Sequence, residues 1–323
     1  MGLSVLMILV GLALLFAGGH WLVKGATAIS LLARVSTTVV ALTVVSMGTS
    51  MPELAVSLTA ALRGSTDISY ANVVGSNIFN VGAILGVAAL MAVIPVRQQT
   101  LRLEYPIMFV VSLLALAFAH DRVVDRLEGF VLMTLLVGFV GLMIVLARSE
   151  VHTAEESEPR ELRRRMHLRN GQSTAWLRSA FLVAVGIAVL VAGAELSVRG
   201  AVTIAEVMGI EERIIGLTVI AMGTSLPELA TSVVAARQGE SEIALGNVVG
   251  SNIFNLLGIL GVTAAIVPVP VNARALALDN WVMLAFAAVM LPMMLWQRRV
   301  SRTDATILLA GFVVYIAFLI IWG

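Results

Sequence analysis

Two glutamates stand at equivalent places in a repeated sequence, each inside an apolar segment. Glu53 ends the motif G-T-S-M-P-E, and Glu228 ends the motif G-T-S-L-P-E 175 residues later. A second motif, N-V-V-G-S-N-I-F-N, occupies residues 72–80 and returns unchanged at residues 247–255. Acidic side chains are unfavourable inside a membrane, so a repeated pair of them indicates an ion pathway.

Each glutamate shares a helical face with other oxygen-bearing side chains, because these residues recur at intervals of four. The first half supplies Thr49, Glu53 and Ser57 in one segment and Asn72, Ser76 and Asn80 in the next. The second half supplies the equivalents Thr224, Glu228, Ser232, Asn247, Ser251 and Asn255. Neighbouring rows add Ser46, Ser50 and Ser225, while Ala221 stands where the first half has Ser46.

Prolines add backbone oxygens to these faces. Pro52 and Pro227 have no N–H for the carbonyl four residues back, so each predicts a discontinuous helix that frees the carbonyl of Gly48 or Gly223. The resulting set of carboxylate, hydroxyl, amide and carbonyl oxygens suits Ca²⁺ and Na⁺ better than copper or zinc. Two glutamates carry a formal charge of −2, which one Ca²⁺ or two Na⁺ would neutralise.

The composition places these motifs in a bilayer. Hydrophobic residues make up 59% of the 323 residues and charged residues 13%, which is too apolar for a soluble domain. The chain has no cysteine, so disulfides, thiolate ligands and thiol nucleophiles are excluded. Ten membrane spans are predicted, near residues 3–25, 36–62, 70–95, 103–120, 127–147, 174–198, 211–237, 243–269, 278–296 and 304–322.

The spans form two repeats. Residues 1–147 make the first five-helix repeat, 148–173 a polar linker and 174–323 the second. Five is an odd number, so the second repeat enters the membrane from the opposite side and the repeats are inverted. The linker is rich in arginine, which predicts that it is cytoplasmic and not a nucleic-acid site, and that both termini lie outside the cell (inner) membrane.

Other interpretations of the polar residues remain open. A single Ser or Thr in a membrane helix more often bonds a carbonyl of its own helix, and we interpret only those beside the repeated glutamates as ligands. Asn72 and Asn247 are equally suited to ion binding and to bonds between helices. Asn77 and Asn252 point to another face and are interpreted as structural, and Glu195 as an interfacial residue.

The two motifs resemble those of the cation/calcium exchanger superfamily, whose inverted repeats read G-T-S-x-P-E and then G-S-N-x-x-N. The resemblance covers nearly the whole chain outside the linker and includes the ten-span arrangement of the prokaryotic sodium/calcium exchangers. It implies an all-α integral membrane protein with discontinuous helices at its centre. It further implies that the first and sixth spans slide across the other eight.

The resemblance also implies a ligand set. Calcium would be bound by Glu53, Glu228, Thr49 and Thr224. Sodium would use both glutamates together with Ser50, Ser225, Ser76, Ser251 and the backbone carbonyls of Ser46 and Ala221. Some relatives have aspartate at the central positions 80 and 255, where this chain has Asn80 and Asn255, so its pocket holds two acids and not three.

We therefore expect an antiporter that exchanges Ca²⁺ for Na⁺ and acts as a monomer, with no enzymatic activity and no cofactor. Calcium/proton exchange at the same glutamates is the alternative, although that branch usually has G-N in place of G-T-S. A cation channel is a second alternative, which the inverted repeat disfavours because channels more often form a ring of subunits. An intramembrane hydrolase would need a nucleophile and a base that two identical motifs do not supply.

Overall fold

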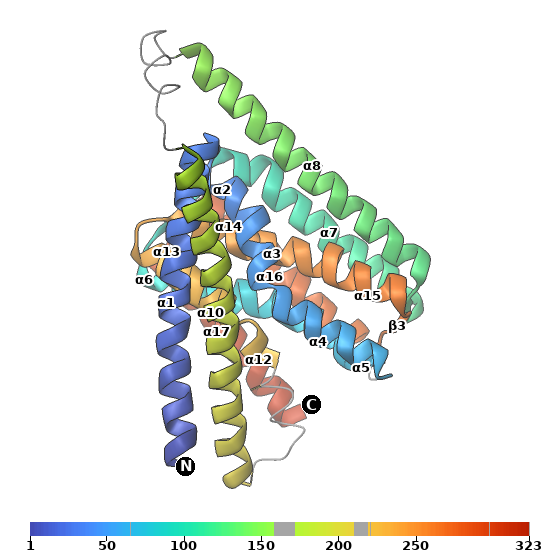
Figure 1. The fold of residues 1–323 in the computed structure, drawn as a ribbon. Coiled ribbons are helices and arrows are strands. Elements are labelled where there is room, and N and C mark those ends of the chain that lie inside the picture. Colours follow the sequence, from blue (N-terminus) through green and yellow to red (C-terminus); the bar gives the residue numbers. More distant parts are fainter. Residues whose placement is uncertain (65, 158–171, 210–218, 220, 297, 323) are drawn as a thin grey trace.

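The computed structural model describes residues 1–64, 66–157, 172–209, 219, 221–296 and 298–322. The fold is almost entirely helical (Figure 1). Within the described residues, eight helices are long and apolar enough to span a membrane, and one bent pair makes a ninth. These nine coincide with predicted spans, while the seventh predicted span, 211–237, lies partly outside the described residues, as does the linker 148–173.

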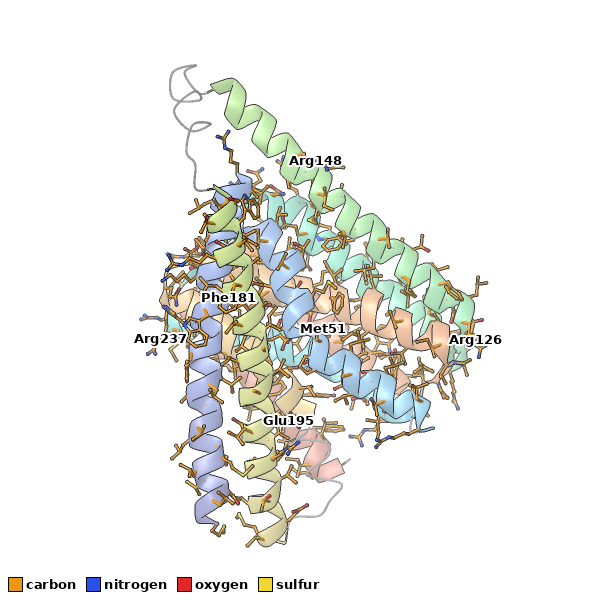
Figure 2. All side chains as sticks on the ribbon, viewed as in Figure 1. Met51, Arg126, Arg148, Phe181, Glu195 and Arg237 are labelled. Carbon is orange, nitrogen blue, oxygen red and sulfur yellow. The ribbon has the colours of Figure 1, made fainter. Side chains whose placement is uncertain are left out.

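The first half contains five predicted spans, of which the second, third and fourth include π-helical or 3₁₀ turns. Its helices are α1 (Gly2–Ala33), α2 (Thr37–Val40), the π-helix η1 (Ala41–Val45), α3 (Ser46–Thr49), α4 (Met51–Leu62), α5 (Thr66–Phe79), the π-helix η2 (Asn80–Leu85), α6 (Gly86–Met91), the π-helix η3 (Thr100–Glu104), α7 (Tyr105–Phe118), the short 3₁₀ turn η4 (Ala119–Asp121) and α8 (Arg126–Ser157). The apolar part of α8 runs from Arg126 to Arg148, and both arginines are labelled along this helix in Figure 2.

The second half follows the same order. Its helices are α10 (Gln172–Val207), α12 (Ala221–Thr224), α13 (Leu226–Arg237), α14 (Ser241–Phe254), the π-helix η6 (Asn255–Leu260), α15 (Gly261–Ile266), the π-helix η7 (Ala275–Asp279), α16 (Asn280–Leu295) and α17 (Arg302–Trp322). The π-helices η2 and η6 both begin at the last asparagine of the repeated motif, so the irregular backbone is duplicated along with the sequence.

The predicted discontinuity is present in both halves. α3 and α4 meet at a bend of 44°, and the break falls at Ser50, with φ −85° and ψ 8°. Ser225 separates α12 from α13 with nearly the same dihedral angles, φ −90° and ψ 10°. Pro52 and Pro227 occupy the first turn of the following helix, where a missing N–H is tolerated.

The glycine of each motif has a packing role that the sequence interpretation missed. A Cβ atom on Gly48 would lie 2.3 Å from Ile187 Cδ1, and one on Gly223 would lie 2.2 Å from Val198 Cγ2. Ile187 and Val198 both belong to α10. These glycines therefore let α10 approach the two helices just before their breaks, and the backbone departs from helical geometry two residues later.

Two spans form the centre of the molecule. In the span made by α5, η2 and α6, and in the span made by α14, η6 and α15, 83% of the most apolar window is buried. The other long spans are buried over only 17% to 39% of theirs. The repeated asparagine motif therefore runs through the interior, while most of the surface of the other long spans faces outward, as expected where the surroundings are lipid.

α1 and α10 pack side by side in opposite directions (Figure 1). Glycines recur every seven residues on both helices and lie in the contact: Gly11, Gly18 and Gly25 on α1, and Gly186, Gly193 and Gly200 on α10. A Cβ atom on Gly18 would lie 2.8 Å from the backbone oxygen of Gly186. The two helices therefore touch through their backbones, as small residues allow in membranes.

Short antiparallel strands join loops of the two halves. β1 (Ile94–Pro95) pairs with β4 (Arg299–Val300), and β2 (Val123–Val124) pairs with β3 (Val269–Pro270). Each ribbon therefore brings together one loop from each repeat. The loop after the third predicted span meets the loop after the ninth, and the loop after the fourth meets the loop after the eighth.

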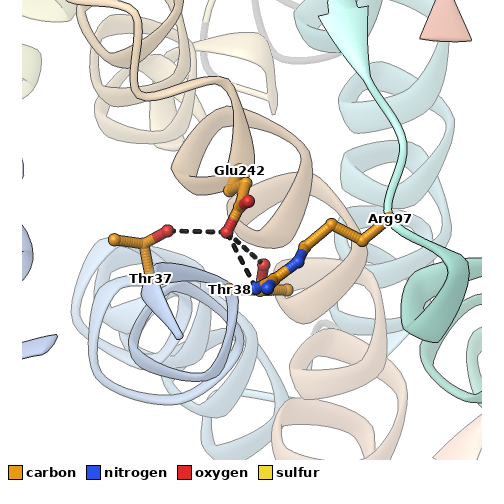
Figure 3. Close-up of polar contacts among 4 residues, drawn as sticks. All are labelled: Thr37, Thr38, Arg97 and Glu242. Atoms are coloured by element: carbon orange, nitrogen blue, oxygen red, sulfur yellow. Dashed lines mark hydrogen bonds and ion pairs between the residues drawn. The ribbon is translucent and has the colours of Figure 1, made fainter. Parts of the chain in front are cut away.

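A polar cluster links the halves near β1. Glu242, in the first turn of α14, accepts hydrogen bonds from Thr37 at 2.8 Å and from Thr38 at 3.2 Å through the same carboxylate oxygen (Figure 3). Arg97, two residues beyond β1, forms an ion pair with that oxygen at 3.2 Å. The cluster ties the beginning of α2 to the beginning of α14.

The backbone contact between α1 and α10 generates a test. We expect Gly18→Ala to lower the thermal unfolding temperature of the purified protein, because the added methyl group meets backbone atoms that cannot move aside, at a cost of about 1–3 kcal/mol. Gly138→Ala on α8 is the matched control, since nothing lies within 4 Å of a Cβ atom there. Equal unfolding temperatures for the two variants would contradict the close contact.

Candidate cation site

The repeated glutamates lie at the centre of the molecule, at the beginning of two half-helices. Glu53 is in the first turn of α4 and Glu228 in the first turn of α13, and each is 1% exposed. Met51, the first residue of α4, marks this level in Figure 2. The free N–H groups and the dipole at a helix N-terminus favour a negative charge there.

Each carboxylate is held by the opposite repeat. Ser50 Oγ donates a hydrogen bond of 2.8 Å to Glu228 Oε1, and Ser225 Oγ donates one of 2.7 Å to Glu53 Oε1. The hydroxyl of Thr49, the residue before Ser50, lies 3.1 Å from the Val45 carbonyl oxygen of its own helix. The serines are the residues at which the helices break, so the breaks aim their hydroxyls across the interface.

Two asparagines fasten these half-helices to the central spans. Asn72 Nδ2 donates to the Glu53 carbonyl oxygen at 3.3 Å and to Ser57 Oγ at 2.9 Å. Asn247 repeats the pattern with the Glu228 carbonyl at 3.3 Å and Ser232 at 3.0 Å, and its Oδ1 accepts from Thr49 at 3.3 Å. Of the two roles that the sequence left open, the structure gives Asn72 and Asn247 bonds between helices.

Four amides form a further exchange between the repeats. Asn80 Nδ2 donates to Asn252 Oδ1 at 3.0 Å, and Asn255 Nδ2 donates to Asn77 Oδ1 at 3.0 Å. All four side chains are at most 3% exposed. The sequence interpretation treated Asn77 and Asn252 as structural, because they fall outside the row of residues at intervals of four that contains Asn80 or Asn255.

Several buried oxygens of this region have no hydrogen-bond partner within the described part of the chain. They are Glu53 Oε2, Glu228 Oε2, Ser251 Oγ, Asn80 Oδ1 and Asn255 Oδ1. A buried polar atom without a partner costs about 1–3 kcal/mol, so such a cluster in the interior calls for a ligand. Every atom in it can accept, and a hard cation is the ligand that such oxygens suit.

The remaining predicted ligands lie around this group. Ser76 is buried and its hydroxyl accepts from Ser225 at 3.3 Å. The Ser46 carbonyl accepts the Ser50 N–H at 3.0 Å and the Thr49 hydroxyl at 3.3 Å. The backbone of Ala221 belongs to α12. Sodium binding at these positions stays a prediction.

Two acids within spans were not singled out from the sequence. Glu104 and Asp279 end the π-helices η3 and η7, and they are separated by the same 175 residues as the motif glutamates. Glu104 is buried, and Asp279 accepts a hydrogen bond from Tyr315 at 3.0 Å. The constant offset was the signal that could have identified this pair.

Glu195 lies apart from the central glutamates, and its interfacial position stays a prediction. It lies on α10, its side chain is exposed, and it is paired with Arg199 one turn further along (Figure 2). Within the described residues, no group of three or more His, Cys, Asp or Glu side chains is arranged to hold a metal. The central group therefore combines two carboxylates with neutral oxygens, a set that suits Ca²⁺ or Na⁺.

Comparison with known proteins gives a consistent result. The family described as sodium/calcium exchanger protein matches residues 3–145 and 178–321, which is most of the chain. The sodium/calcium exchanger MaX1 of Methanosarcina acetivorans is 33% identical over 343 residues, covering 98% of this chain and 97% of that protein. The inner membrane protein YrbG of Escherichia coli is 34% identical over 319 residues, covering 98% of this chain and 97% of that one.

A solved structure is similar over the same extent. It is that of the sodium-calcium exchanger NCX_Mj soaked with 10 mM Na⁺ and 10 mM Sr²⁺, with a TM-score of 0.83 and 28% sequence identity. The alignment covers 98% of both chains.

Proposed function

This chain belongs to the sodium/calcium exchanger family, and from that premise we propose that it is an antiporter that exchanges Ca²⁺ for Na⁺ at the central cation site. The observation that carries the proposal is the reciprocal bonding of the glutamates. Ser50 holds Glu228 and Ser225 holds Glu53, while the second oxygen of each carboxylate is left for a ligand. One site shared by two inverted halves can be reached from either side of the membrane in turn.

The charge of the site gives a physical reason for coupling. An empty site would hold two unneutralised carboxylates in a dry interior, which opposes the rearrangement that moves the site from one side to the other. One Ca²⁺ or two Na⁺ would cancel that charge. The rearrangement is therefore favoured when the site is filled. A protein whose site must be filled to move in either direction exchanges one ion for the other.

We assign the ligands as the family resemblance implies. Glu53, Glu228, Thr49 and Thr224 would bind calcium. The same glutamates would bind sodium with Ser50, Ser225, Ser76, Ser251 and the carbonyls of Ser46 and Ala221. Asn80 and Asn255 would contribute neutral amide oxygens at the centre, so the filled site needs no third acid.

The strand ribbons support ten membrane crossings. The strands β2 and β3 pair, so both lie at the same face of the molecule. The chain segment between them must therefore begin and end at that face. Between them, α8, α10 and the span of α14, η6 and α15 give three crossings, which would end on the opposite face. We infer that a fourth crossing lies between α10 and α14 and includes α12 and α13, so the halves are inverted.

The same ribbons support the predicted orientation. Arg97 and Arg102 follow β1. Its partner β4 contains Arg299 and is flanked by Arg298 and Arg302, so two arginine-rich loops meet at one face. We propose that this face is cytoplasmic and that both termini lie outside, in a cell membrane like that of the inner-membrane relative. All residues of the site come from one chain, which is consistent with action as a monomer.

The proposal is tested by ⁴⁵Ca²⁺ uptake into proteoliposomes. Internal Na⁺ should drive uptake against sodium-free external buffer, and equal internal and external Na⁺ should not. Uptake that ignores internal Na⁺ and follows a pH gradient would replace this proposal with calcium/proton exchange. Uptake down the calcium gradient that needs no counter-ion would indicate a channel.

Each glutamate can be tested by its own substitution. We expect Glu53→Gln and Glu228→Gln each to reduce sodium-driven calcium flux by about 100-fold or more, because a divalent ion is left undercompensated in a buried site. Glu206→Gln, an exposed acid at the end of α10, is the control and should retain flux. Near-normal flux in either site variant, with the protein folded and inserted, would refute the site.

Substitution of Ser251 should affect the binding of Na⁺ and Ca²⁺ to different extents. Its buried hydroxyl has no partner within the described residues, and a neutral ligand matters more to a monovalent ion, which gains less from the carboxylates. We expect Ser251→Ala to raise the half-saturating Na⁺ concentration by about fivefold and to change that for Ca²⁺ less. Thr263→Val on α15, which also removes a buried unpartnered hydroxyl, should change neither. Equal shifts for both ions would argue against a separate sodium ligand.

Single cysteines test the orientation, because the native chain has none. A cysteine at Asp125, between β2 and α8, should react with a membrane-impermeant thiol reagent in intact cells. A cysteine at Arg164 in the linker, outside the described residues, should react only after the membrane is opened. Labelling of the cysteine at position 164 from outside would show that the orientation is the reverse of the one proposed. Labelling of both cysteines from the same side would be incompatible with the number of spans.

A further inference from the structure

We infer that Asn77 and Asn252 are positioning residues for the central cation site: each fixes the amide of the opposite repeat's Asn255 or Asn80, so that its oxygen and not its NH₂ group faces the ion. The inference rests on the proposed function, because it concerns the ligands of the same site. It assigns a role to two residues that do not face the site themselves.

The problem that these residues solve is particular to asparagine. The two ends of an amide have almost the same shape, but one accepts and the other donates. A half-turn of the Asn80 or Asn255 side chain would replace a cation ligand by a group that repels cations. A carboxylate has no such difficulty, because both of its ends are acceptors.

The bonds between the repeats remove this ambiguity. Asn80 Nδ2 is directed to Asn252 Oδ1 at 3.0 Å, and Asn255 Nδ2 to Asn77 Oδ1 at 3.0 Å. The opposite atoms, Asn80 Oδ1 and Asn255 Oδ1, are buried without a partner in the described part of the chain. Each amide is therefore bonded at its nitrogen end and available at its oxygen end.

Asn77 and Asn252 are oriented in turn by two methionines. Asn252 Nδ2 lies 3.6 Å from Met108 Sδ on α7, and Asn77 Nδ2 lies 3.6 Å from Met283 Sδ on α16 and 3.4 Å from the Asn252 carbonyl oxygen. Met108 and Met283 are themselves 175 residues apart, and both are at most 3% exposed. The contact between an asparagine and a methionine is thus repeated in the two halves.

A thioether sulfur can accept a hydrogen bond but cannot donate one. If Asn252 turned over, its oxygen would face the sulfur of Met108 and its NH₂ group would face the NH₂ group of Asn80. Two favourable contacts would become two unfavourable ones in a dry interior, where no water can compensate. The sulfur therefore fixes Asn252, and Asn252 fixes Asn80.

The competing explanation is that Asn77 and Asn252 only hold the two central spans together. That role would not depend on which end of Asn80 or Asn255 faces the ion. The two explanations predict different results in a variant background where the orientation of the side chain at position 80 or 255 no longer matters. Asn80→Asp provides this background, because an aspartate presents oxygen in either orientation.

The experiment is a double-mutant cycle read by calorimetric titration of the purified protein with Ca²⁺. Asn252→Leu, which removes the acceptor at similar volume, should weaken Ca²⁺ binding by about tenfold or more in the native background, the loss typical of residues that orient a metal ligand. In the Asn80→Asp background the same substitution should weaken binding by less than about twofold. An equal loss in both backgrounds would show that Asn252 acts only through packing.

Pair specificity gives a second readout. Asn80→Asp should not relieve the loss caused by Asn77→Leu, whereas Asn255→Asp should, because Asn77 is bonded to Asn255. Relief by the wrong partner would overturn the assignment. Thr263→Val serves as the control for the loss of a buried polar group and should leave Ca²⁺ binding unchanged.

Failure of this inference is distinguishable from failure of the proposed function. A native protein that neither binds Ca²⁺ nor exchanges it would remove both. A native protein that does both, with Asn252→Leu binding Ca²⁺ equally well, would remove only the positioning role. If Asn252→Leu does not fold, Met108→Leu replaces it as a milder change, and it should give a smaller loss that Asn80→Asp abolishes; an undiminished loss there would overturn the positioning role.

Discussion

Two carboxylates buried at membrane depth are the constraint on which the rest of this structure depends. In the described interior, one oxygen of each carboxylate accepts a hydrogen bond from a serine of the other repeat. The two halves are therefore complementary at their centre, and neither half could hold its glutamate alone. The second carboxylate oxygens and the central amide oxygens remain as acceptors, so the proposed cation site lies at the interface of the repeats.

Irregular backbone is the means by which side chains reach that interface. Regular helices would satisfy every N–H and carbonyl group within themselves and would leave no helix ends at membrane depth. The breaks at Ser50 and Ser225 place the first turns of α4 and α13 beside the carboxylates, where free N–H groups favour negative charge. The π-helices η2 and η6 begin at Asn80 and Asn255, the residues whose amide oxygens complete the group.

The outer helices differ from this centre in how they are held. α1 and α10 contact each other through glycine backbones over several turns, and α10 approaches the broken helices at Gly48 and Gly223. Close backbone packing of this kind holds the two helices together as one unit. The strand ribbons and the Glu242 cluster instead join loops and helix ends of different repeats, so the core is fastened at both faces.

The sequence by itself determined the elements and the chemistry. Apolar length located nine of the spans, because bilayer thickness sets the length of a crossing helix, and the 175-residue repeat identified Glu53, Glu228 and the hydroxyls one turn away. Only the tertiary structure decided which residue bonds to which. Spacing along one helix cannot indicate that Ser50 donates a hydrogen bond to the glutamate of the other repeat. Nor can it indicate that Asn77 accepts one from Asn255. Those pairings arise where the two repeats of one chain meet, and no local pattern encodes them.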